Sequence, residues 1–367
     1  MPMQNRHRGG RLALALAILT IGTAPVSGAS AAPERPRAEI LALSTPAVAL
    51  RQPTRAALLA AARAGDALVV AGERGVILRS ADGGATWEQA RVPVGVGITD
   101  LVFTDPVHGF AIGHFGAVLA TDDGGASWGL KLDGYGAGEQ ALATVGAETP
   151  AGARRRAERL EQQGADKPFL SLDWWNGTLS VFGAFSMAFS TTDAGAHWSY
   201  LATELEASDE AHPYGATRLG GDLYLAGELG LLMRRRAGET DFKLLSSPYE
   251  GSFFGILATP TGGLIAFGLL GHAFLSLDAG ESWQRVETGT EATINAVTAL
   301  HDGTLVMATA DGRLLLSRDG GRRFEAAARR VPMLLTDLLE TPAGDLLVTG
   351  LGGLTLVPRA QLTGSGS

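Results

Sequence analysis

The chain of 367 residues contains no cysteine, which excludes disulfides, thiolate metal sites and cysteine nucleophiles. Charged residues make up only 19% of the sequence, and no stretch after the N-terminal region reaches 18 consecutive apolar residues. A transmembrane helix in the later part of the chain is therefore not expected. The composition is nevertheless 46% hydrophobic, which is ample for a large core, and 50 glycines suit a fold with many tight hairpins.

The first 31 residues have the organisation of a signal peptide. Three features carry this prediction: the basic residues Arg6, Arg8 and Arg11, the apolar run from Leu12 to Ile21, and the small-residue site Ala29-Ser30-Ala31. The apolar run is too short to span a bilayer, and no twin-arginine pair is present. We predict Sec-type export to the periplasm with cleavage near Ala31 or Ala32; the alternative is an uncleaved anchor.

The charge balance is acidic, with 38 Asp and Glu against 30 Lys and Arg and a formal net charge of −8. Removing residues 1–31 removes three arginines and no acid, so the charge falls to −11. Such a protein is not expected to bind nucleic acid or an anionic lipid surface through bulk electrostatics. We predict a mature protein that is peripheral to the membrane and not embedded in it.

A short box recurs five times with the order Ser/Thr, any, Asp, any, Gly, any, polar or basic, and Trp or Phe. Its cleanest copy runs from Ser80 to Trp87, and the closing aromatic residues are spaced by 41, 70, 85 and 41 positions. A repeat of this length with strand-like flanks is typical of a propeller or array. The Asp and aromatic residues of the five boxes are Asp82, Trp87, Asp123, Trp128, Asp193, Trp198, Asp278, Trp283, Asp319 and Phe324.

The boxes belong to longer units. Two β-rich runs recur upstream of each box, and the aligned positions 72, 113, 183, 227, 268, 308 and 350 count seven units. Each unit is consistent with four short antiparallel strands, here named a to d, with the box as the c–d hairpin. Seven such sheets arranged radially predict an all-β, seven-bladed β-propeller of four-stranded blades in a single domain over residues 38–358.

Two units depart from the repeat. Unit four has lost the box: Arg234-Arg235-Arg236 stands where Ser-x-Asp is expected, and Phe242 replaces Trp. Unit seven ends at Val357 with no fourth strand, and we predict that Glu39–Ser44 supplies it, so that an N-terminal strand completes the last blade. Residues 359–367 end in Gly-Ser-Gly-Ser and are expected to form a flexible tail.

The 70-residue gap predicts an inserted flap at residues 131–168, between blades two and three. A helix is expected from Gly152 to Gln163, with Gly164 as its stop. Because its apolar stripe consists only of Ala153, Ala157 and Leu160, we expect weak anchoring.

The box aspartates are interpreted as clamps of the c–d turns. An Asp at a tight turn accepts backbone N–H bonds from the following residues, and Gly84 and its equivalents permit positive φ. Calcium ligands or catalytic acids are the alternative, which is disfavoured because the five lie in different blades and do not converge. The seven histidines show no metal-ligand spacing, so no metal or cofactor is predicted.

The pattern Ser-x-Asp-x-Gly-x-Thr-Trp resembles the Asp box, or BNR repeat, of sialidases and many other propellers. The longer phrases Gly72–Trp87 and Gly113–Trp128 resemble more closely the exported propellers similar to the photosystem II stability/assembly factor. The resemblance covers roughly residues 38–358; its motifs are specific for the fold and weak for function. Bacterial relatives without photosystems are associated with RND-type exporters, and Ser247–Gly255 is similar to that subgroup, which implies a periplasmic assembly or accessory role.

In propellers with this strand order the c–d hairpins lie on one face, here called the box face. The b–c turns and d–a links lie on the opposite face, here called the b–c face, which ligands and partners usually use. Aromatic and charged residues at these turns are not needed to pack blades, and such residues anchor interfaces. The predicted partner-binding face comprises Glu73, Arg74, His114, Phe115, Phe185, Glu228, Tyr249, Glu250, Phe253 and Phe254. The alternative is that Phe115, Phe185 and Phe253 simply plug the channel mouth.

Two arginine runs, at 154–156 and 234–236, are interpreted as solvated turns; the alternative is an anion or partner patch. A sialidase-like hydrolase needs three arginines that bind the substrate carboxylate, a Tyr–Glu nucleophile pair, and an Asp that acts as the acid. The family's Arg-Ile-Pro motif is missing, and Tyr249-Glu250, adjacent in sequence, does not readily form a nucleophile–base pair.

We therefore predict no catalytic residues. The expected function is a non-enzymatic exported scaffold, an assembly or accessory factor that docks an integral membrane protein complex such as an RND-type transporter. The alternatives are a glycan- or small-molecule-binding propeller and a sialidase-like glycoside hydrolase.

Overall fold

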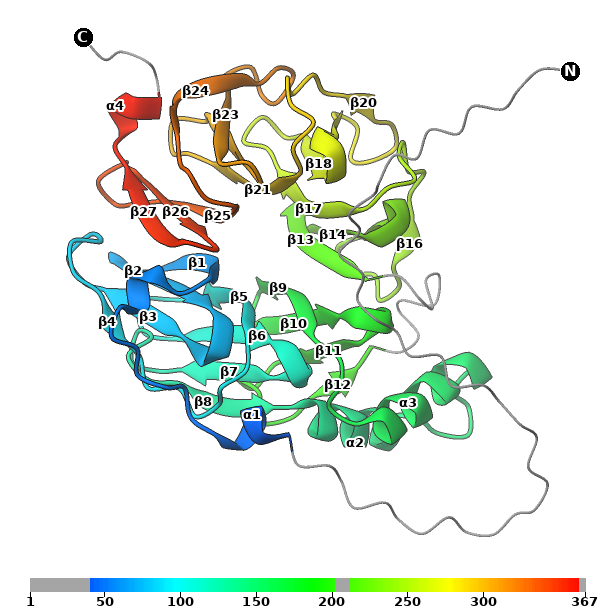
Figure 1. Ribbon diagram of the computed structural model, residues 1–367. Helices are drawn as coiled ribbons and strands as arrows, with labels where there is room; N and C mark the ends of the chain where they lie inside the picture. The colour runs from blue at the N-terminus through cyan, green and yellow to red at the C-terminus, as the bar shows by residue number, and fades with distance from the viewer. Residues whose placement is uncertain (1–39, 202–211, 363–367) are drawn as a thin grey trace, which may run out of the picture. The chain divides into compact units, whose positions relative to one another are not determined.

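A computed structural model describes residues 40–201 and 212–362. Seven antiparallel sheets follow one another around a central space (Figure 1). The first strand of each sheet contacts the first strand of the next sheet, so the a strands line the centre and the later strands lie toward the rim. The predicted all-β, seven-bladed propeller is confirmed, and the predicted signal peptide at 1–31 lies outside the described residues.

The strands of each blade run in chain order. Blade one holds β1 (Leu58–Ala64), β2 (Ala67–Gly72), β3 (Ile77–Ser80) and β4 (Glu88–Gln89); blade two holds β5 (Ile98–Phe103), β6 (Gly109–Gly113), β7 (Val118–Thr121) and β8 (Gly129–Leu132); blade three holds β9 (Phe169–Trp175), β10 (Thr178–Gly183), β11 (Ala188–Thr191) and β12 (Ser199–Tyr200); blade four holds β13 (Pro213–Leu219), β14 (Asp222–Gly227), β15 (Leu232–Arg235) and β16 (Lys243–Leu244). Blade five holds β17 (Phe253–Ala258), β18 (Leu264–Gly268), β19 (Ala273–Ser276) and β20 (Gln284–Arg285); blade six holds β21 (Ile294–Ala299), β22 (Leu305–Thr309), β23 (Arg313–Ser317) and β24 (Glu325–Arg330); blade seven holds β25 (Leu335–Glu340), β26 (Leu346–Gly350) and β27 (Gly353–Val357).

The predicted N-terminal strand of blade seven is wrong. Leu41–Ser44 forms a short helix, α1, and the sheet of blade seven has three strands in the described part of the chain. Residues 45–50 instead follow the rim of blade one, where the Ala47 N–H donates to the Val92 carbonyl at 3.0 Å. The Leu50 N–H donates to Gln89 Oε1, also at 3.0 Å. Because Leu41–Ser44 is helical and residues 45–50 are bonded to blade one, neither stretch pairs with β27.

The ring closes through side chains and inner-strand hydrogen bonds. Leu50 packs into the hydrophobic cluster between blades seven and one. The Ala61 N–H of β1 donates to Asp337 Oδ2 of β25 at 2.8 Å, and Thr336 Oγ1 donates to the Leu58 carbonyl at 2.6 Å. These contacts replace the shared sheet that the sequence predicts.

The beginning of the predicted flexible tail is ordered. Arg359–Leu362 forms helix α4, and the Arg359 N–H donates to Asp345 Oδ1 at 2.9 Å. Leu362 is buried in the cluster between blades six and seven. The flexible tail is thus a wrong prediction for these four residues, whereas 363–367 lie outside the described ranges.

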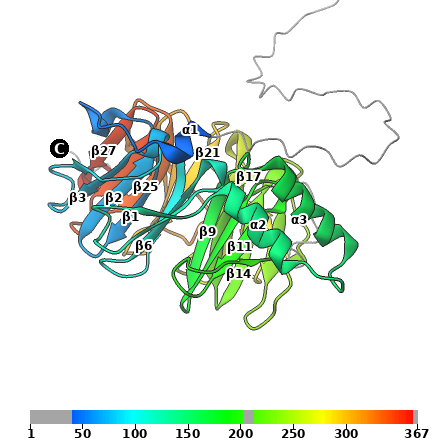
Figure 2. The same cartoon turned by 90° about the horizontal axis from the view of Figure 1, so that it is seen from below.

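The insertion between blades two and three consists of two helices, α2 (Gly134–Thr144) and α3 (Ala151–Gln163), which lie side by side (Figure 2). The predicted stripe of Ala153, Ala157 and Leu160 is buried, and Gly164 ends α3 with a φ of 70°. The expected weak anchoring is wrong because both helices bury residues in the cluster shared by blades two and three. Every helix within the described ranges is too short or too polar to cross a lipid bilayer.

Candidate functional site

The box aspartates are saturated with local hydrogen bonds. Asp82 Oδ1 accepts from Ser80 Oγ at 2.7 Å and from the Thr86 N–H at 2.9 Å, while Oδ2 accepts from Thr86 Oγ1 at 2.5 Å. These donors, with those of Thr86 first, lower the pKa of Asp82 to about 2. The box aspartates of the other four copies make similar hydrogen bonds. The geometry is that of a turn clamp, and it leaves little acceptor capacity for a ligand.

The lost box of blade four is replaced by contacts to blade five. Arg234 is buried, and its guanidinium lies 2.9 Å from Glu281 and donates to the Ala279 carbonyl at 3.1 Å. Arg235 lies over the ring of Phe242 at 5.0 Å. The interpretation of this run as a solvated turn is therefore wrong for Arg234, which joins two blades.

Five b–c turns share an unusual backbone. The turns are η2 (Glu73–Gly75), η3 (His114–Gly116), η4 (Ala184–Ser186), η5 (Glu228–Gly230) and η6 (Leu269–Gly271). The central residues are Arg74, Phe115, Phe185, Leu229 and Leu270, and their φ angles lie between 52° and 60°. This left-handed region favours Gly, Asn or Asp, and a bulky residue there costs on the order of 1–3 kcal/mol. Each turn therefore carries a residue that its backbone disfavours.

The side chains at these turns are displayed to solvent. Phe185 is 50% exposed, Leu270 63% and Leu229 76%. Arg74 is also exposed, whereas Phe115 is half-buried against the cluster between blades one and two. Three large apolar side chains thus project from strained turns of one face, a combination that packing of the blades does not require.

A row of aromatic rings leads from η4 toward the centre of the ring. The ring centroids of Phe185 and His212 are 4.8 Å apart, those of His212 and Tyr214 6.3 Å, and those of Tyr214 and Phe254 5.8 Å. His212 Nδ1 lies 3.4 Å from Glu228, and burial together with the charge of Glu228 raises the pKa of Tyr214. The row connects the exposed turn of blade three with the inner strands of blades four and five.

Tyr214 and Phe254 occupy a bulge that recurs in the inner strands. At the same position, blades two, six and seven carry Thr99, Asn295 and Thr336, each of which donates to a carbonyl of the next blade at 2.6–2.7 Å. In blades four and five an aromatic ring stands where blades two, six and seven have a polar link to the next blade, while blades one and three carry Leu59 and Leu170 there.

Two carboxyl groups of the inner strands have raised pKa values. Burial, with the charge of Asp337 as a second cause, raises the pKa of Asp100 to about 7, and burial raises that of Asp337 to about 6. Both side chains remain partly open to solvent. Asp100 accepts from the Leu101 N–H and Asp337 from those of Ala61 and Leu338, each at 2.8 Å. Their oxygens are held by backbone donors, which favours a structural role over acid catalysis.

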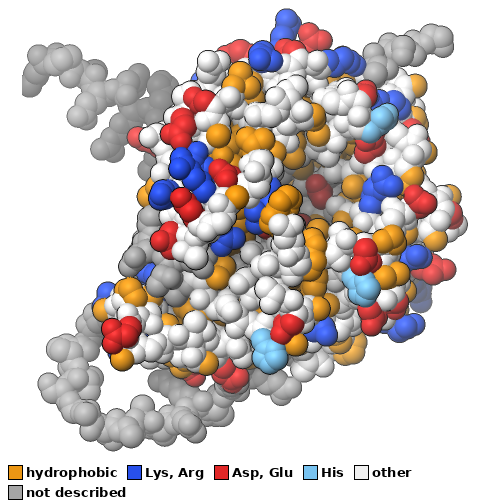
Figure 3. All heavy atoms as spheres, turned by 180° about the vertical axis from the view of Figure 1, so that it is seen from behind, with side chains coloured by type: hydrophobic (Ala, Val, Ile, Leu, Met, Phe, Trp, Pro, Cys, Tyr) orange, Lys and Arg blue, Asp and Glu red, His pale blue; other side chains and the backbone are white. Residues whose placement is uncertain are grey.

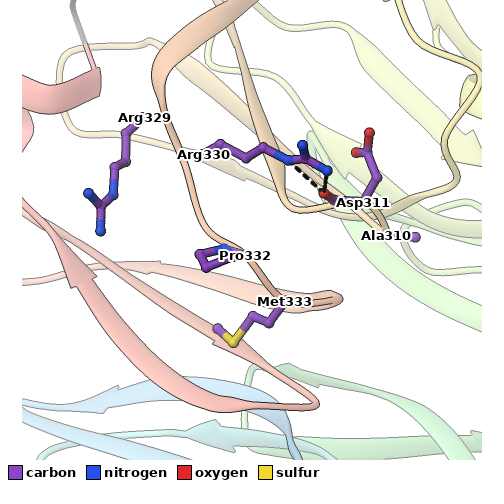
Figure 4. Close-up of a pocket in the computed structure, with 6 residues that line it drawn as sticks. All are labelled: Ala310, Asp311, Arg329, Arg330, Pro332 and Met333. Carbon is purple, nitrogen blue, oxygen red and sulfur yellow. Dashed lines mark hydrogen bonds between the residues drawn. The ribbon is translucent and has the colours of Figure 1, made fainter.

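A pocket of about 650 Å³ opens between the b–c turn of blade six and the link to blade seven. In Figure 4 Arg330 reaches Asp311, whose carbonyl accepts from Nε at 3.0 Å and Nη2 at 2.7 Å, while Arg329 points the other way. Pro332 and Met333 also line the pocket. Seen from behind, the molecule has acidic and basic side chains interspersed around its rim (Figure 3).

The sequence matches, over residues 85–357, the family model described as photosynthesis system II assembly factor YCF48. The chain belongs to this family. A YCF48 structure with a bound D1 peptide is 18% identical, with a TM-score of 0.62 over 86% of this chain and 99% of that one. YCF48 from Cyanidioschyzon merolae is 15% identical, with a TM-score of 0.62 over 83% and 96%.

The fold is shared beyond the YCF48 family. The WD40 propeller domain of Doa1 is 12% identical, with a TM-score of 0.61 over 86% of this chain and 95% of that one. No curated protein matches the sequence. At these identities the solved structures establish the propeller alone, and membership of the YCF48 family indicates a scaffold for assembling protein complexes.

The predicted site residues of this YCF48-family chain differ in their exposure and contacts. Glu73, Arg74, His114 and Glu250 are exposed, and Glu73 accepts from the Ala57 N–H at 3.2 Å. Partial desolvation of its ring nevertheless lowers the pKa of His114. No hydrogen bond joins Tyr249 to Glu250 among the described residues, which does not favour a Tyr–Glu nucleophile pair.

One predicted site residue is misplaced and two others were overlooked. Phe253 is fully buried in the cluster between blades four and five, so its place on the binding face is wrong. Tyr249 packs beside it, with its ring 4.5 Å from that of His272. The overlooked residues are His212 and Tyr214. Tyr214 could have been found, because it follows the first residue of its strand exactly as Phe254 does in the next blade.

Proposed function

We propose that this protein is an exported, non-enzymatic accessory or assembly factor whose b–c face docks an integral membrane protein complex, such as an RND-type transporter. The single observation that carries the proposal is the set of strained b–c turns with exposed Phe185, Leu229 and Leu270. Strain of this kind persists where the displayed side chain has a use. Apolar and aromatic anchors with an arginine nearby are the residue types that dominate protein interfaces.

The phrase shared with the RND-associated subgroup adds support from its position. Residues 247–255 build the link into blade five on this same face, and the Leu229 N–H donates to Ser252 Oγ at 3.4 Å. Tyr249 anchors the link by packing against Phe253 and Phe274. A YCF48 protein has been solved with a D1 peptide bound, which supports a protein as the class of partner.

Affinity capture from native membranes tests the proposal. The tagged mature protein is expected to recover one dominant integral membrane partner. The triple variant Phe185→Asn, Leu229→Asn and Leu270→Asn removes the apolar tips and keeps the left-handed turns, so recovery should fall at least tenfold. The matched control is Leu277→Asn in the box of blade five, 54% exposed on the opposite face, which should leave recovery unchanged.

Two results would contradict the proposal. Full recovery by the triple variant would show that the b–c face is not the docking surface. Recovery of no membrane protein would show that the protein does not dock a membrane complex. Export is tested separately by the mass of the protein from the periplasmic fraction. An N-terminus near Ala31 or Ala32 is expected, and an intact Met1 in the cytoplasm would overturn it.

A further inference from the structure

A second site lies on the box face, between blades two and three. Here a pocket of about 640 Å³ is lined by His108, Phe110, Asp122, Trp128, Lys131 and Trp174. Its volume falls in the range of small-molecule sites, and such sites combine aromatic walls with a few polar groups. The pocket shares none of these residues with the b–c face.

Two tryptophans line this pocket: Trp174, whose ring is partly open to solvent, and Trp128, which is only 6% exposed. Trp174 is half-buried, and its ring centroid lies 5.7 Å from that of Phe110 with 30° between the planes. Trp128 is held by a hydrogen bond from Nε1 to the Gly125 carbonyl at 3.2 Å and by edge contact with Phe103 at 6.0 Å. A ligand therefore meets apolar surfaces that are already oriented.

A bulge in β8 brings a lysine to the pocket. Val118 pairs with Leu132 and Leu119 with Leu130, so Lys131 has no partner on β7. In the other five four-stranded blades the residue three positions after the box aromatic, or after Phe242 in blade four, is aliphatic: Ala90, Leu201, Leu245, Val286 or Ala327. Blade two places Leu132 in the core instead and leaves Lys131 exposed at the pocket. Bulges that redirect one side chain in this way are frequent next to functional sites.

Asp122 supplies the opposite charge. The other four boxes carry Ala, Thr, Leu or Arg at its position, so a carboxylate here is particular to blade two. Asp122 and Lys131 are both exposed, and within the described part of the chain neither has an ion pair. Two opposite charges that line one pocket without pairing leave room for a ligand between them.

From this arrangement we infer that the pocket binds a carbohydrate. The apolar face of a pyranose ring fits against Trp174, and neighbouring hydroxyls donate to Asp122 and accept from Lys131 through charge-assisted bonds. Phosphate ligands fit poorly, because the lining holds the carboxylate of Asp122 as well as its single lysine, Lys131. Lipid chains fit poorly because the charged pair interrupts the apolar wall.

Titration of the mature protein with chitotriose, cellotriose and maltotriose tests the inference by tryptophan fluorescence and calorimetry. At least one trisaccharide should bind with a dissociation constant of about 1 mM or lower. Trp174→Ala and Lys131→Ala should each weaken that binding about tenfold or more. The matched control is Trp175→Ala, the adjacent tryptophan, which is 44% exposed, stacks on Arg218 and does not line the pocket.

Absence of binding by all three trisaccharides, or equal losses in Trp174→Ala and Trp175→Ala, would overturn the inference. If Trp174→Ala fails to fold, Asp122→Asn and Lys131→Ala change exposed side chains only and carry the same test. Because the pocket and the b–c face share no residue, a negative result here leaves the membrane-docking proposal standing, and the reverse also holds.

Discussion

The two faces of the propeller use left-handed backbone in opposite ways. On the box face, glycines such as Gly84 and Gly125 take most of the positive φ angles, with the small residues Ala194 and Ala279 in two of the boxes, and the aspartates are bonded to the turn. On the b–c face, Arg74, Phe185 and Leu229 take positive φ angles and project outward. The box hairpins are thus optimised for stability, whereas the b–c turns give up stability to display particular side chains. A stability measurement can therefore distinguish a structural turn from one kept for binding.

The largest expected effect is on the box face. Asp123→Ala removes acceptors for Thr121 Oγ1 and for the N–H and Oγ of Ser127, at 2.6–2.9 Å. We expect the free energy of unfolding, measured by urea denaturation, to fall by about 2 kcal/mol. Asp122→Ala, one residue earlier, removes an exposed carboxylate without such bonds and should change the free energy of unfolding by no more than about 0.5 kcal/mol. Equal effects of the two variants would contradict the clamp interpretation.

On the b–c face we expect a substitution that raises the free energy of unfolding. Leu229→Asn places a residue that tolerates the left-handed region at a φ of 52°, so the free energy of unfolding should rise by about 0.5–1 kcal/mol. Leu244→Asn is the control: this leucine is 53% exposed but lies in β16, where asparagine is disfavoured, so stability should drop slightly. A loss of stability in Leu229→Asn as large as in Leu244→Asn would mean that the turn is not strained.

The smallest expected effect is on the pH dependence of stability, which differs between the box aspartates and Asp100 of the inner strand β5. The box aspartates have lowered pKa values, so their stabilisation is present above about pH 4 and is lost only as the pH falls toward 2. Asp100 has a raised pKa of about 7, so its contribution is present at low pH and is lost as the pH rises through 7. Between pH 5 and 8 the stability of Asp100→Asn should therefore decline less than that of the parent protein.

The lowered pKa values of two histidines act in the other direction. Burial lowers the pKa of His114 and of His272, so their contributions are lost as the pH falls. Both remain in Asp100→Asn, so the difference between the two urea-denaturation series reports the carboxyl group of Asp100 together with its coupling to Asp337. Parallel pH profiles would contradict the raised pKa.

The propeller could be predicted because the hydrogen bonds that define each box join residues close together in the sequence. Each box Asp bonds residues two and four positions away, so the pattern survives in the sequence whatever the blades pack against. Helix α2 was not predicted because Gly134, Gly136 and Gly138 lower helix propensity. Tertiary packing overrides that propensity: a Cβ at Gly138 would lie 2.7 Å from the Cα of Glu161 in α3, so glycine is what lets the two helices meet.

The candidate site was only partly predictable because exposure depends on partners distant in sequence. Phe253 and Phe254 are adjacent on β17, yet the first is fully buried and the second half-buried, because Phe254 occupies the bulge between Phe253 and Gly255. Arg234 has the composition of a surface turn, but Glu281 of the next blade gives its charge a partner. Pairings across blades leave no pattern in the local sequence.

The three-stranded seventh blade has a mechanical consequence. In a propeller whose first and last segments share a sheet, pulling on the chain ends loads a row of backbone hydrogen bonds. Here the joint between blades seven and one consists of packing around Leu50 and a few bonds such as that from Ala61 to Asp337. We expect tension between the two ends to open the ring at this joint before any blade unfolds.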